Sequence, residues 1–209
     1  MSKKKNSTLT AFFAMIPIWI IAGVISLSLS ECTNKENHIP RLTAYPRINL
    51  CDTVYAKSHL LPVNFEINAE SIAIEDSSNT STDGSKWINV FYPKYNATLY
   101  YTYTPVVSST IDGVIDNRIE RISLNIGSLT SEMTELNTHS GVTAKIISTP
   151  TSVVTPLQFI ATNNSSWVIS GAFCFNETTN ISTDSISPIL KAVNNDLIHT
   201  IINLNNDAR

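Results

Sequence analysis

The sequence has little charge of either sign. Only 15% of its 209 residues are charged and the formal net charge is −3, whereas an average soluble domain is about a quarter charged. Lysine and arginine form no dense cluster in the body of the chain, although nucleic-acid-binding proteins concentrate them on one surface. Nucleic acid is therefore not an expected partner. The hydrophobic fraction of 43% is ordinary for a folded domain and argues against a disordered chain.

Residues that build most catalytic and metal sites are also scarce. The chain has six glycines, four histidines and three cysteines. It contains no G-x-S-x-G motif and no glycine-rich phosphate loop. The four histidines have no metal-ligand spacing with one another or with cysteine; they are His38, His59, His139 and His199. The sequence therefore predicts no catalytic residue, no metal and no cofactor.

Two pairs of titratable residues are one helical turn apart in regions expected to be helical. They are Asp196 with His199, and Glu132 with Glu135. Such pairs acquire acid–base function when burial or a close neighbour shifts their pKa. Each pair is expected on a solvated helix surface, so the predicted protein is not an enzyme.

One long apolar run is present, near the N-terminus. Lys3, Lys4 and Lys5 precede the run Leu9–Leu27, an order typical of a signal peptide. The following residues, Leu29-Ser30-Glu31-Cys32, resemble a bacterial lipobox, although Glu31 stands where glycine, alanine or serine is usual. Residues 1–31 are therefore expected to be a lipoprotein signal peptide, with Cys32 as the site of lipidation.

The same run allows a second interpretation. Its roughly 19 residues are just long enough to cross a bilayer as a helix, so the segment could be retained as a membrane anchor. Pro17 and the small residues near the end of the run favour cleavage. With either anchor, the body of the protein is expected outside the cytoplasm and attached to a membrane.

Two further cysteines, Cys51 and Cys174, allow one pairing. An oxidising compartment permits a disulfide between them. Cys174, however, alternates with Phe173 and Phe175 in an apolar strand, where a free cysteine behaves as a small buried hydrophobic residue. Both possibilities remain open from the sequence.

Seven segments have the composition of β-strands, since they are rich in aromatic and β-branched residues and are bounded by turn residues. A tight turn at Asn163–Ser165 is expected to join the last two in a hairpin. The seven strands are expected at residues 62–68, 71–75, 87–92, 96–104, 142–148, 156–162 and 167–175.

Two helices are expected. A stripe of apolar residues spaced three or four apart predicts one long helix, with Ser109 near its start, Ile119 buried in its middle and His139 near its end. The stripe consists of Ile111, Ile115, Ile119, Ile122, Ile126, Leu129, Met133 and Leu136. A second helix is expected to begin at Ser187 and Pro188, a combination suited to a helix N-terminus.

These elements predict a single α+β domain with a mostly antiparallel sheet. Both amphipathic helices are expected to cover the one apolar face of that sheet. The predicted organisation is a signal peptide at 1–31, a lipid-anchored tether and entry segment at 32–61, and the folded domain at 62–209.

Tyrosines concentrate in the strand at 96–104 and its neighbour. Tyrosine rings are common at interfaces, so an exposed tyrosine face could contact a sugar or a protein. Ordinary half-buried sheet packing is the alternative. The residues considered for a partner or ligand face are Tyr100, Tyr103, Thr98 and Thr102.

Several blocks of the sequence resemble the GldD family of gliding-motility lipoproteins of Bacteroidetes. The longest runs from Trp87 to Tyr103 (WINVFYPKYNATLYYTY). The others, in the order of the family, are residues 40–48, 158–163, 171–176, 184–188 and 196–199.

The resemblance implies a non-enzymatic accessory lipoprotein of gliding motility and the associated type IX secretion machinery. Its implied partners are a membrane, through the lipid anchor, and envelope proteins of that machinery; its implied location is the periplasm-facing cell envelope. The alternative function is an envelope ligand-binding module that uses the tyrosine-rich sheet face for glycan or peptidoglycan.

The lipidation site generates the first prediction. Cys32→Ala removes the thiol that would carry lipid, so an uncleaved or soluble form should replace the lipoprotein, because stable attachment needs at least two acyl chains. Intact-mass measurement of the membrane-extracted wild-type protein should find a lipidated Cys32 as the first residue. Retention of residues 1–31 without lipid would instead support the membrane helix.

Overall fold

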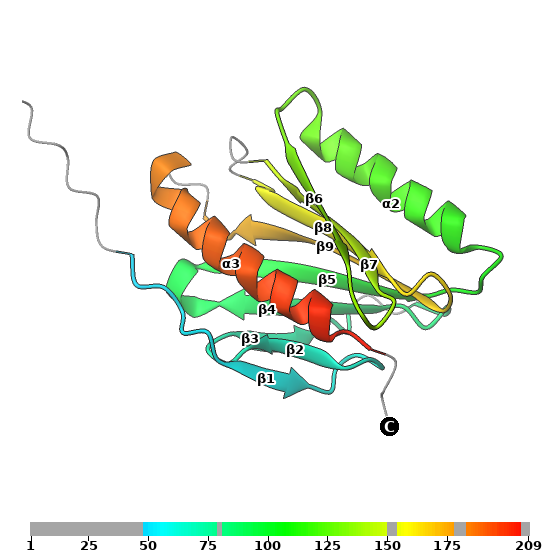
Figure 1. Cartoon of the computed structure of the whole chain (residues 1–209). Coiled ribbons are helices and arrows are strands. Elements are labelled where there is room, and N and C mark those ends of the chain that lie inside the picture. Colours follow the sequence, from blue (N-terminus) through cyan, green and yellow to red (C-terminus); the bar gives the residue numbers. More distant parts are fainter. Residues whose placement is uncertain (1–47, 79–80, 150–153, 178–182, 206–209) are drawn as a thin grey trace, which may run out of the picture. The chain divides into compact units, whose positions relative to one another are not determined.

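The computed structural model describes residues 48–78, 81–149, 154–177 and 183–205. The expected signal peptide and Cys32 lie outside this range. Within it, no helix is both long and apolar enough to cross a bilayer. The described residues form an α+β domain with a mostly antiparallel sheet and two α-helices, which confirms the predicted fold class (Figure 1).

The principal sheet has seven strands in the order β3-β4-β5-β9-β8-β7-β6, and every neighbouring pair is antiparallel. A separate hairpin consists of β1 and β2. The strands are β1 (Tyr55–Ser58), β2 (Phe65–Asn68), β3 (Ile72–Glu75), β4 (Lys86–Tyr92), β5 (Ala97–Pro105), β6 (Glu132–Asn137), β7 (Thr143–Ser148), β8 (Leu157–Thr162) and β9 (Trp167–Phe175).

All seven predicted strands are present. The hairpin between β8 and β9 is also confirmed: the Asn163 carboxamide oxygen accepts hydrogen bonds from the backbone N–H groups of Ser165, Ser166 and Trp167. Asn164 adopts a positive φ of 56°, a conformation that asparagine tolerates better than most residues. Strand β1 was not predicted, because it lies within residues 32–61 and has only four residues.

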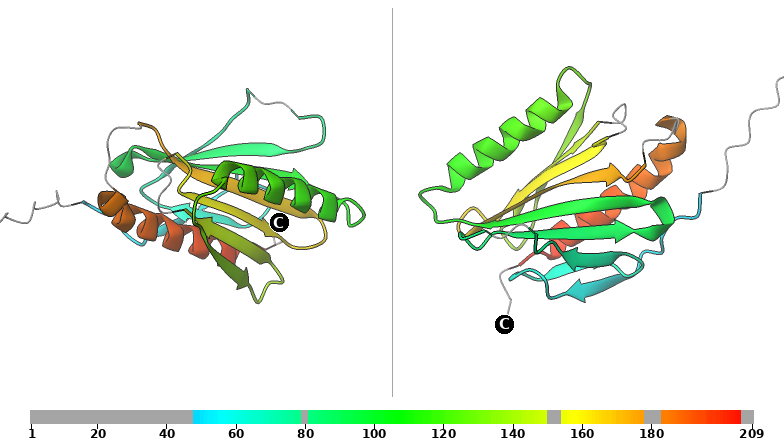
Figure 2. Two further views of the ribbon diagram at one scale, coloured as in Figure 1. Left: turned by 90° about the horizontal axis from the view of Figure 1, so that it is seen from above. Right: turned by 180° about the vertical axis from the view of Figure 1, so that it is seen from behind.

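The two α-helices, α2 (Ile111–Ile126) and α3 (Thr183–Asn203), pack on opposite faces of the sheet (Figures 1 and 2). On strand β8, Phe159 joins the core beneath α3, and the next residue, Ile160, joins a small cluster beneath α2. The expected coverage of one face by both helices is therefore wrong. Its physical reason is that β8 is buried along its whole length, so both of its faces require a cover.

The principal core lies between the sheet, helix α3 and the β1–β2 hairpin. Helix α3 contributes Val193, Leu197 and Ile201, all fully buried. The sheet contributes aromatic residues that meet edge to face, including Tyr101 with Phe159 at 5.2 Å between ring centroids. Burial of these large side chains supplies most of the stabilisation expected for the domain.

Helix α2 is shorter than its apolar stripe predicts. It ends at Ile126, because Gly127 adopts a φ of 57° and its N–H bonds the Ser123 carbonyl. Residues 132–137, expected to be helical, form strand β6 and pair with β7, where Met133 lies opposite Ile147. The helical spacing of Met133 and Leu136 was therefore coincidental, and pairing with the sheet decided their conformation.

The stripe is also less buried than expected. Only Ile111 and Ile122 of α2 are buried, whereas Ile119 is 37% exposed, so its expected burial is wrong. Both helix starts differ too. The residue that precedes α2 is Thr110 rather than Ser109, and α3 begins at Thr183, with Pro188 inside the helix rather than at its first position.

The unequal burial of the two helices predicts unequal effects of truncating a leucine. Leu197→Ala removes a fully buried side chain on α3 and should lower the free energy of unfolding by about 2–5 kcal/mol. The matched variant Leu124→Ala removes a side chain on α2 that is 74% exposed and should change it by less than about 0.5 kcal/mol. Urea denaturation followed by tryptophan fluorescence measures both; equal effects would contradict the assignment of the core to the α3 face.

Candidate functional site: two clefts beside helix α2

Helix α2 contacts only strands β8 and β9 closely. Its contact is a small apolar cluster built from Ile111, Ile160 and Val168. Because a single helix is narrower than the sheet, a cleft remains on each side of it among the described residues.

The first cleft lies between α2 and strands β5 and β9 and has a volume of about 240 Å³. We refer to it as the arginine cleft. It is lined by Tyr100, Thr102, Arg118, Arg121, Ile122, Asn125, Gln158, Phe159, Ser170, Gly171 and Ala172.

Two arginines on successive turns of α2 form its helical wall. The Arg118 guanidinium donates a hydrogen bond to the Thr104 hydroxyl at 3.3 Å. Burial and the nearby charge of Arg121 lower the pKa of Arg118, while Asp83 acts in the opposite direction. Arginine stays protonated despite such shifts, so the cleft carries two positive charges. One turn further on, the Asn125 side chain donates to the Gln158 carboxamide oxygen at 3.0 Å and ties the helix to the sheet.

Small residues form the floor of the arginine cleft. A Cβ atom at Gly171 would lie 2.0 Å from the Tyr100 carbonyl oxygen and 2.5 Å from the Phe159 ring. Such contacts are impossible, so this position requires glycine for strands β5 and β9 to pair as they do. The missing side chain of Gly171 makes room on the core face of the sheet, where Phe159 packs. Its neighbours Ser170 and Ala172, which pair with Thr102 and Tyr100, are the small residues beneath the arginines.

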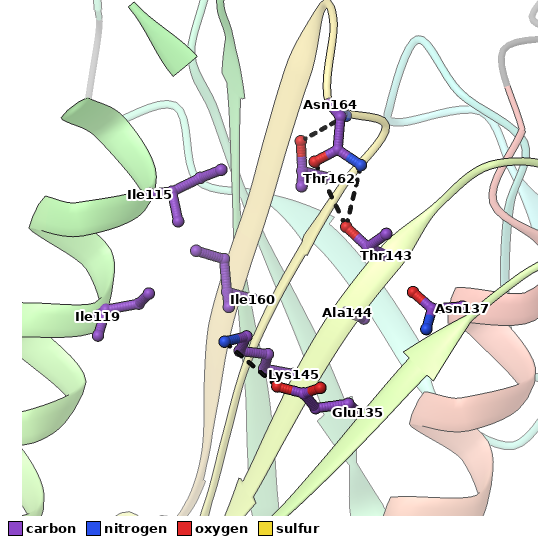
Figure 3. Close-up of a pocket in the computed structure, with 10 residues that line it drawn as sticks. All are labelled: Ile115, Ile119, Glu135, Asn137, Thr143, Ala144, Lys145, Ile160, Thr162 and Asn164. Atoms are coloured by element: carbon purple, nitrogen blue, oxygen red, sulfur yellow. Dashed lines mark hydrogen bonds and ion pairs between the residues drawn. The ribbon is translucent and has the colours of Figure 1, made fainter. Parts of the chain in front are cut away.

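The second cleft, which we refer to as the isoleucine cleft, lies on the other side of α2, over strands β6, β7 and β8, and measures about 250 Å³ (Figure 3). Ile115 and Ile119 of the helix face Ile160 of β8 across it. Its outer wall is polar, with Lys145 and Glu135 paired at 3.3 Å. This cleft combines an apolar wall with a neutralised rim and contains no unpaired charge among its described lining residues.

The four residues expected on a partner or ligand face are divided between the two faces of the sheet. Tyr100, 43% exposed, and Thr102 line the arginine cleft. Thr98 shares their strand face but is buried and donates a hydrogen bond to Asn176 at 2.9 Å. Tyr103 points to the opposite face, where it is 8% exposed in the core. Tyr103 therefore cannot belong to this surface, and a binding role for the other three stays a prediction.

The expected solvated pair of Asp196 and His199 is instead part of a polar cluster between α3 and the β1–β2 hairpin. Asp196 is only 5% exposed and accepts hydrogen bonds from the Tyr55 hydroxyl at 3.0 Å and from the Asn68 carboxamide at 3.2 Å. His199 lies 3.0 Å from a Glu66 oxygen, and its ring stacks on Tyr55 with 3.5 Å between centroids. The expectation was wrong because three of these partners come from a hairpin whose first strand the sequence did not predict.

Burial shifts the pKa values of two groups in this cluster, Asp196 and Tyr55. It raises the pKa of Asp196, although hydrogen bonds from Tyr55, Asn68 and Tyr92 and the proximity of His199 act in the opposite direction. Burial and the adjacent Asp196 raise the pKa of Tyr55 to about 12, so its hydroxyl remains a donor at neutral pH. These groups are used in holding the hairpin against α3. No group of three or more metal-ligating side chains occurs in the described part of the chain.

The remaining residues considered from the sequence are dispersed. Cys51 and Cys174 are free thiols; Cys51 packs against the core beneath α3, while Cys174 lies opposite Thr98 on the other face of the sheet. A disulfide between them is absent. Glu132 and Glu135 lie on strand β6 rather than on a helix, and His139 is exposed in the turn after that strand.

The arginine cleft was missed at the level of sequence. Arg118 and Arg121 occur three residues apart, which is a common spacing on any exposed helix face. Only the packing of α2 on β8 and β9, next to β5, brings them near Tyr100 and Thr102. The one available signal in the sequence was that neither arginine has an acidic residue three or four positions later, where such a residue could have formed an ion pair with it.

Two comparisons with known proteins bear on the identity of the chain. A family model described as gliding motility lipoprotein GldD matches residues 35–205. A search of curated proteins finds no match.

The raised pKa of Asp196 predicts a pH-dependent contribution to stability. A carboxyl group whose pKa is higher in the folded state stabilises that state most below its ordinary pKa of about 4, and the contribution is lost as pH rises through the folded value. Asp196→Asn lacks this titration. The difference in the free energy of unfolding, wild type minus Asp196→Asn, should therefore decrease as the pH rises from 3.5 to 7.

Urea denaturation of both proteins at several pH values in this range measures the difference. His139→Gln is a suitable control, because His139 is exposed and lies outside the cluster. A wild-type-minus-variant difference that stays constant with pH would contradict the assigned shift.

Proposed function

The chain belongs to the gliding motility lipoprotein GldD family, and on that premise we propose that it is a lipid-anchored accessory component of gliding motility. In this proposal Cys32 carries the lipid, and the folded domain faces the periplasm. The domain works as a binding and assembly partner of envelope proteins in the gliding and associated type IX secretion machinery, without catalysis of its own.

One observation carries the proposal of a binding role. Helix α2 leaves much of its apolar surface uncovered: Leu124 is 74% exposed and Ile119 is 37% exposed, and Leu129 just beyond the helix is also exposed. A helix that covers a sheet normally buries its apolar stripe. Ile119 lies at the isoleucine cleft, whereas Leu124 is on the side of the helix away from the buried Ile111 and Ile122. We take these uncovered side chains as support for a protein-interaction surface. We therefore assign α2 and its flanking clefts as the partner-facing side of the domain.

The use of titratable groups supports a non-enzymatic role. Asp196, Glu66 and His199 belong to a polar cluster in which each is bound to neighbouring side chains of the α3–hairpin interface. These contacts have a structural consequence, because they join two elements that are distant in the sequence. The two clefts beside α2 contain no histidine or cysteine.

The partner-facing surface predicts a selective loss of motility. Leu124→Arg introduces a charge on the exposed side of α2 and should reduce colony spreading of a deletion strain by more than half, while the protein accumulates normally. The matched variant Ile202→Arg changes an exposed aliphatic residue on α3 (53% exposed) and should complement fully. Immunoblots establish the abundance of each protein. Full complementation by Leu124→Arg would remove α2 from the proposed interface.

The absence of catalysis is tested with the same strain. Cys174→Ala and His139→Ala should complement, and His199→Ala should fail only in proportion to a loss of protein. A well-expressed variant among these three that abolished spreading would contradict the proposal and would place an active site near the changed residue.

A second function, binding of an envelope glycan, is favoured by one specific observation. The half-exposed ring of Tyr100 stands at the arginine cleft beside Thr102, on the face of the sheet away from the principal core. An accessible tyrosine next to polar groups suits a sugar, whose apolar ring face packs on the aromatic ring. The chemical class of that sugar is considered below.

A further inference from the structure

Both arginines of the described domain lie in the arginine cleft. The chain has five arginines, and the only two among the described residues, Arg118 and Arg121, both line it. Neither is ion-paired: the four salt bridges of the described residues involve Lys86, Lys94, Lys145 and His199. In a protein with a net charge of −3, two unpaired guanidinium groups in one cleft form a local site for an anion.

The surroundings of the arginines disfavour leaving them without a counter-ion. Arg118 is half-buried, and the neighbouring charge of Arg121 adds repulsion that the nearby Asp83, which forms no ion pair with it, offsets only in part. Its one hydrogen bond, to the Thr104 hydroxyl, uses one of five N–H donors. A carboxylate would accept bidentate hydrogen bonds from such a pair, which is the geometry that distinguishes arginine from lysine.

The other walls of the cleft favour a sugar as the group that carries the carboxylate. Tyr100 offers an exposed aromatic ring, and Thr102 and Asn125 offer hydrogen-bonding groups of the kind that bind sugar hydroxyls. The cleft is smaller than the roughly 300–1,000 Å³ of pockets that enclose drug-sized molecules, so its 240 Å³ suits a group about the size of one saccharide ring.

The position of the cleft excludes one mode of peptide binding. An extended peptide can bind by adding a strand to a free sheet edge. Strand β5, at the floor of the cleft, is paired on both sides, with β4 and with β9. No backbone edge is therefore available to a peptide here.

We propose that the arginine cleft binds the carboxylate of an acidic saccharide, with Arg118 and Arg121 on the carboxylate and the Tyr100 ring against the sugar. The inference rests on the glycan-binding function proposed above and specifies its ligand class. Two sources share this chemistry: a uronic-acid polysaccharide, and the muramic acid of peptidoglycan strands from which the stem peptide has been removed, because the stem peptide otherwise converts that carboxyl group to an amide.

The test is direct binding to the full-length lipoprotein in detergent micelles, measured by isothermal titration calorimetry with defined probes. Tetragalacturonate and N-acetylmuramic acid represent the two sources, and the probe that the protein binds with the higher affinity identifies the source. Chitotetraose supplies sugar without a carboxylate, tetraglutamate supplies carboxylates without sugar, and inorganic phosphate supplies an anion alone.

Saturable binding of at least one carboxylated sugar is expected. Arg121→Gln should weaken it by about tenfold or more, because a hydrogen bond to a charged group is lost. Tyr100→Ser should weaken it by at least about threefold through loss of the ring contact. Lys191→Gln, which removes an exposed positive charge on α3, should leave the affinity unchanged within twofold. Arg121 is exposed, so circular dichroism should find Arg121→Gln folded like the wild type.

Several results would overturn the inference: no binding of either carboxylated sugar, binding of tetraglutamate or phosphate with equal affinity, or no effect of Arg121→Gln. Binding of chitotetraose as tight as that of tetragalacturonate would retain the glycan function and overturn the role of the arginines. The gliding role is decided separately by colony spreading, so failure of one proposal does not imply failure of the other.

Discussion

The pairing of strands β5, β9 and β8 in the middle of the sheet is the constraint on which the other features depend. Strand β8 is buried along its whole length, and β9 over most of it. Strands that are buried on both faces must be covered on both faces. The two helices therefore separate, with α3 over one face and α2 over the other. Gly171 allows this pairing, since any larger residue would collide with the Tyr100 carbonyl and the Phe159 ring.

The two faces are packed very differently. Beneath α3, the sheet, the helix and the β1–β2 hairpin enclose a continuous core with aromatic rings in edge-to-face contact. Beneath α2, three buried residues form the contact, and an open cleft remains on each side. The core on the α3 face therefore contributes most of the stability of the domain. The α2 face can carry exposed apolar side chains and unpaired arginines because the core does not depend on them.

The polar cluster around Asp196 illustrates why a buried acid is not by itself evidence of catalysis. Burial of an unpaired carboxylate is costly, and the cost is offset here by hydrogen bonds from Tyr55 and Asn68. The same bonds fix the hairpin on the helix, because they connect residues more than 100 positions apart. Asp196 and His199 lie one turn apart on α3 and both contact Tyr55 of the hairpin, Asp196 through the tyrosine hydroxyl and His199 by stacking on the ring.

Much of the architecture was determined by the sequence alone. The composition of short segments bounded by turn residues predicts seven of the nine described strands, all except β1 and β6, because β-branched and aromatic residues favour strands locally. The turn at Asn163–Ser166 was likewise predictable, because its conformation depends on the hydrogen-bonding of one local side chain. The family was recognisable from contiguous blocks such as residues 87–103.

Tertiary structure alone decided which face each helix covers, where α2 ends and which polar residues meet. The stripe from Ile111 to Leu136 has one helical period, yet its last part pairs with β7, because long-range backbone hydrogen bonds outweigh local spacing. Arg118 and Arg121 become a site only because α2 packs on strands β8 and β9 beside β5, and a contact between such separate segments is not encoded in any local pattern.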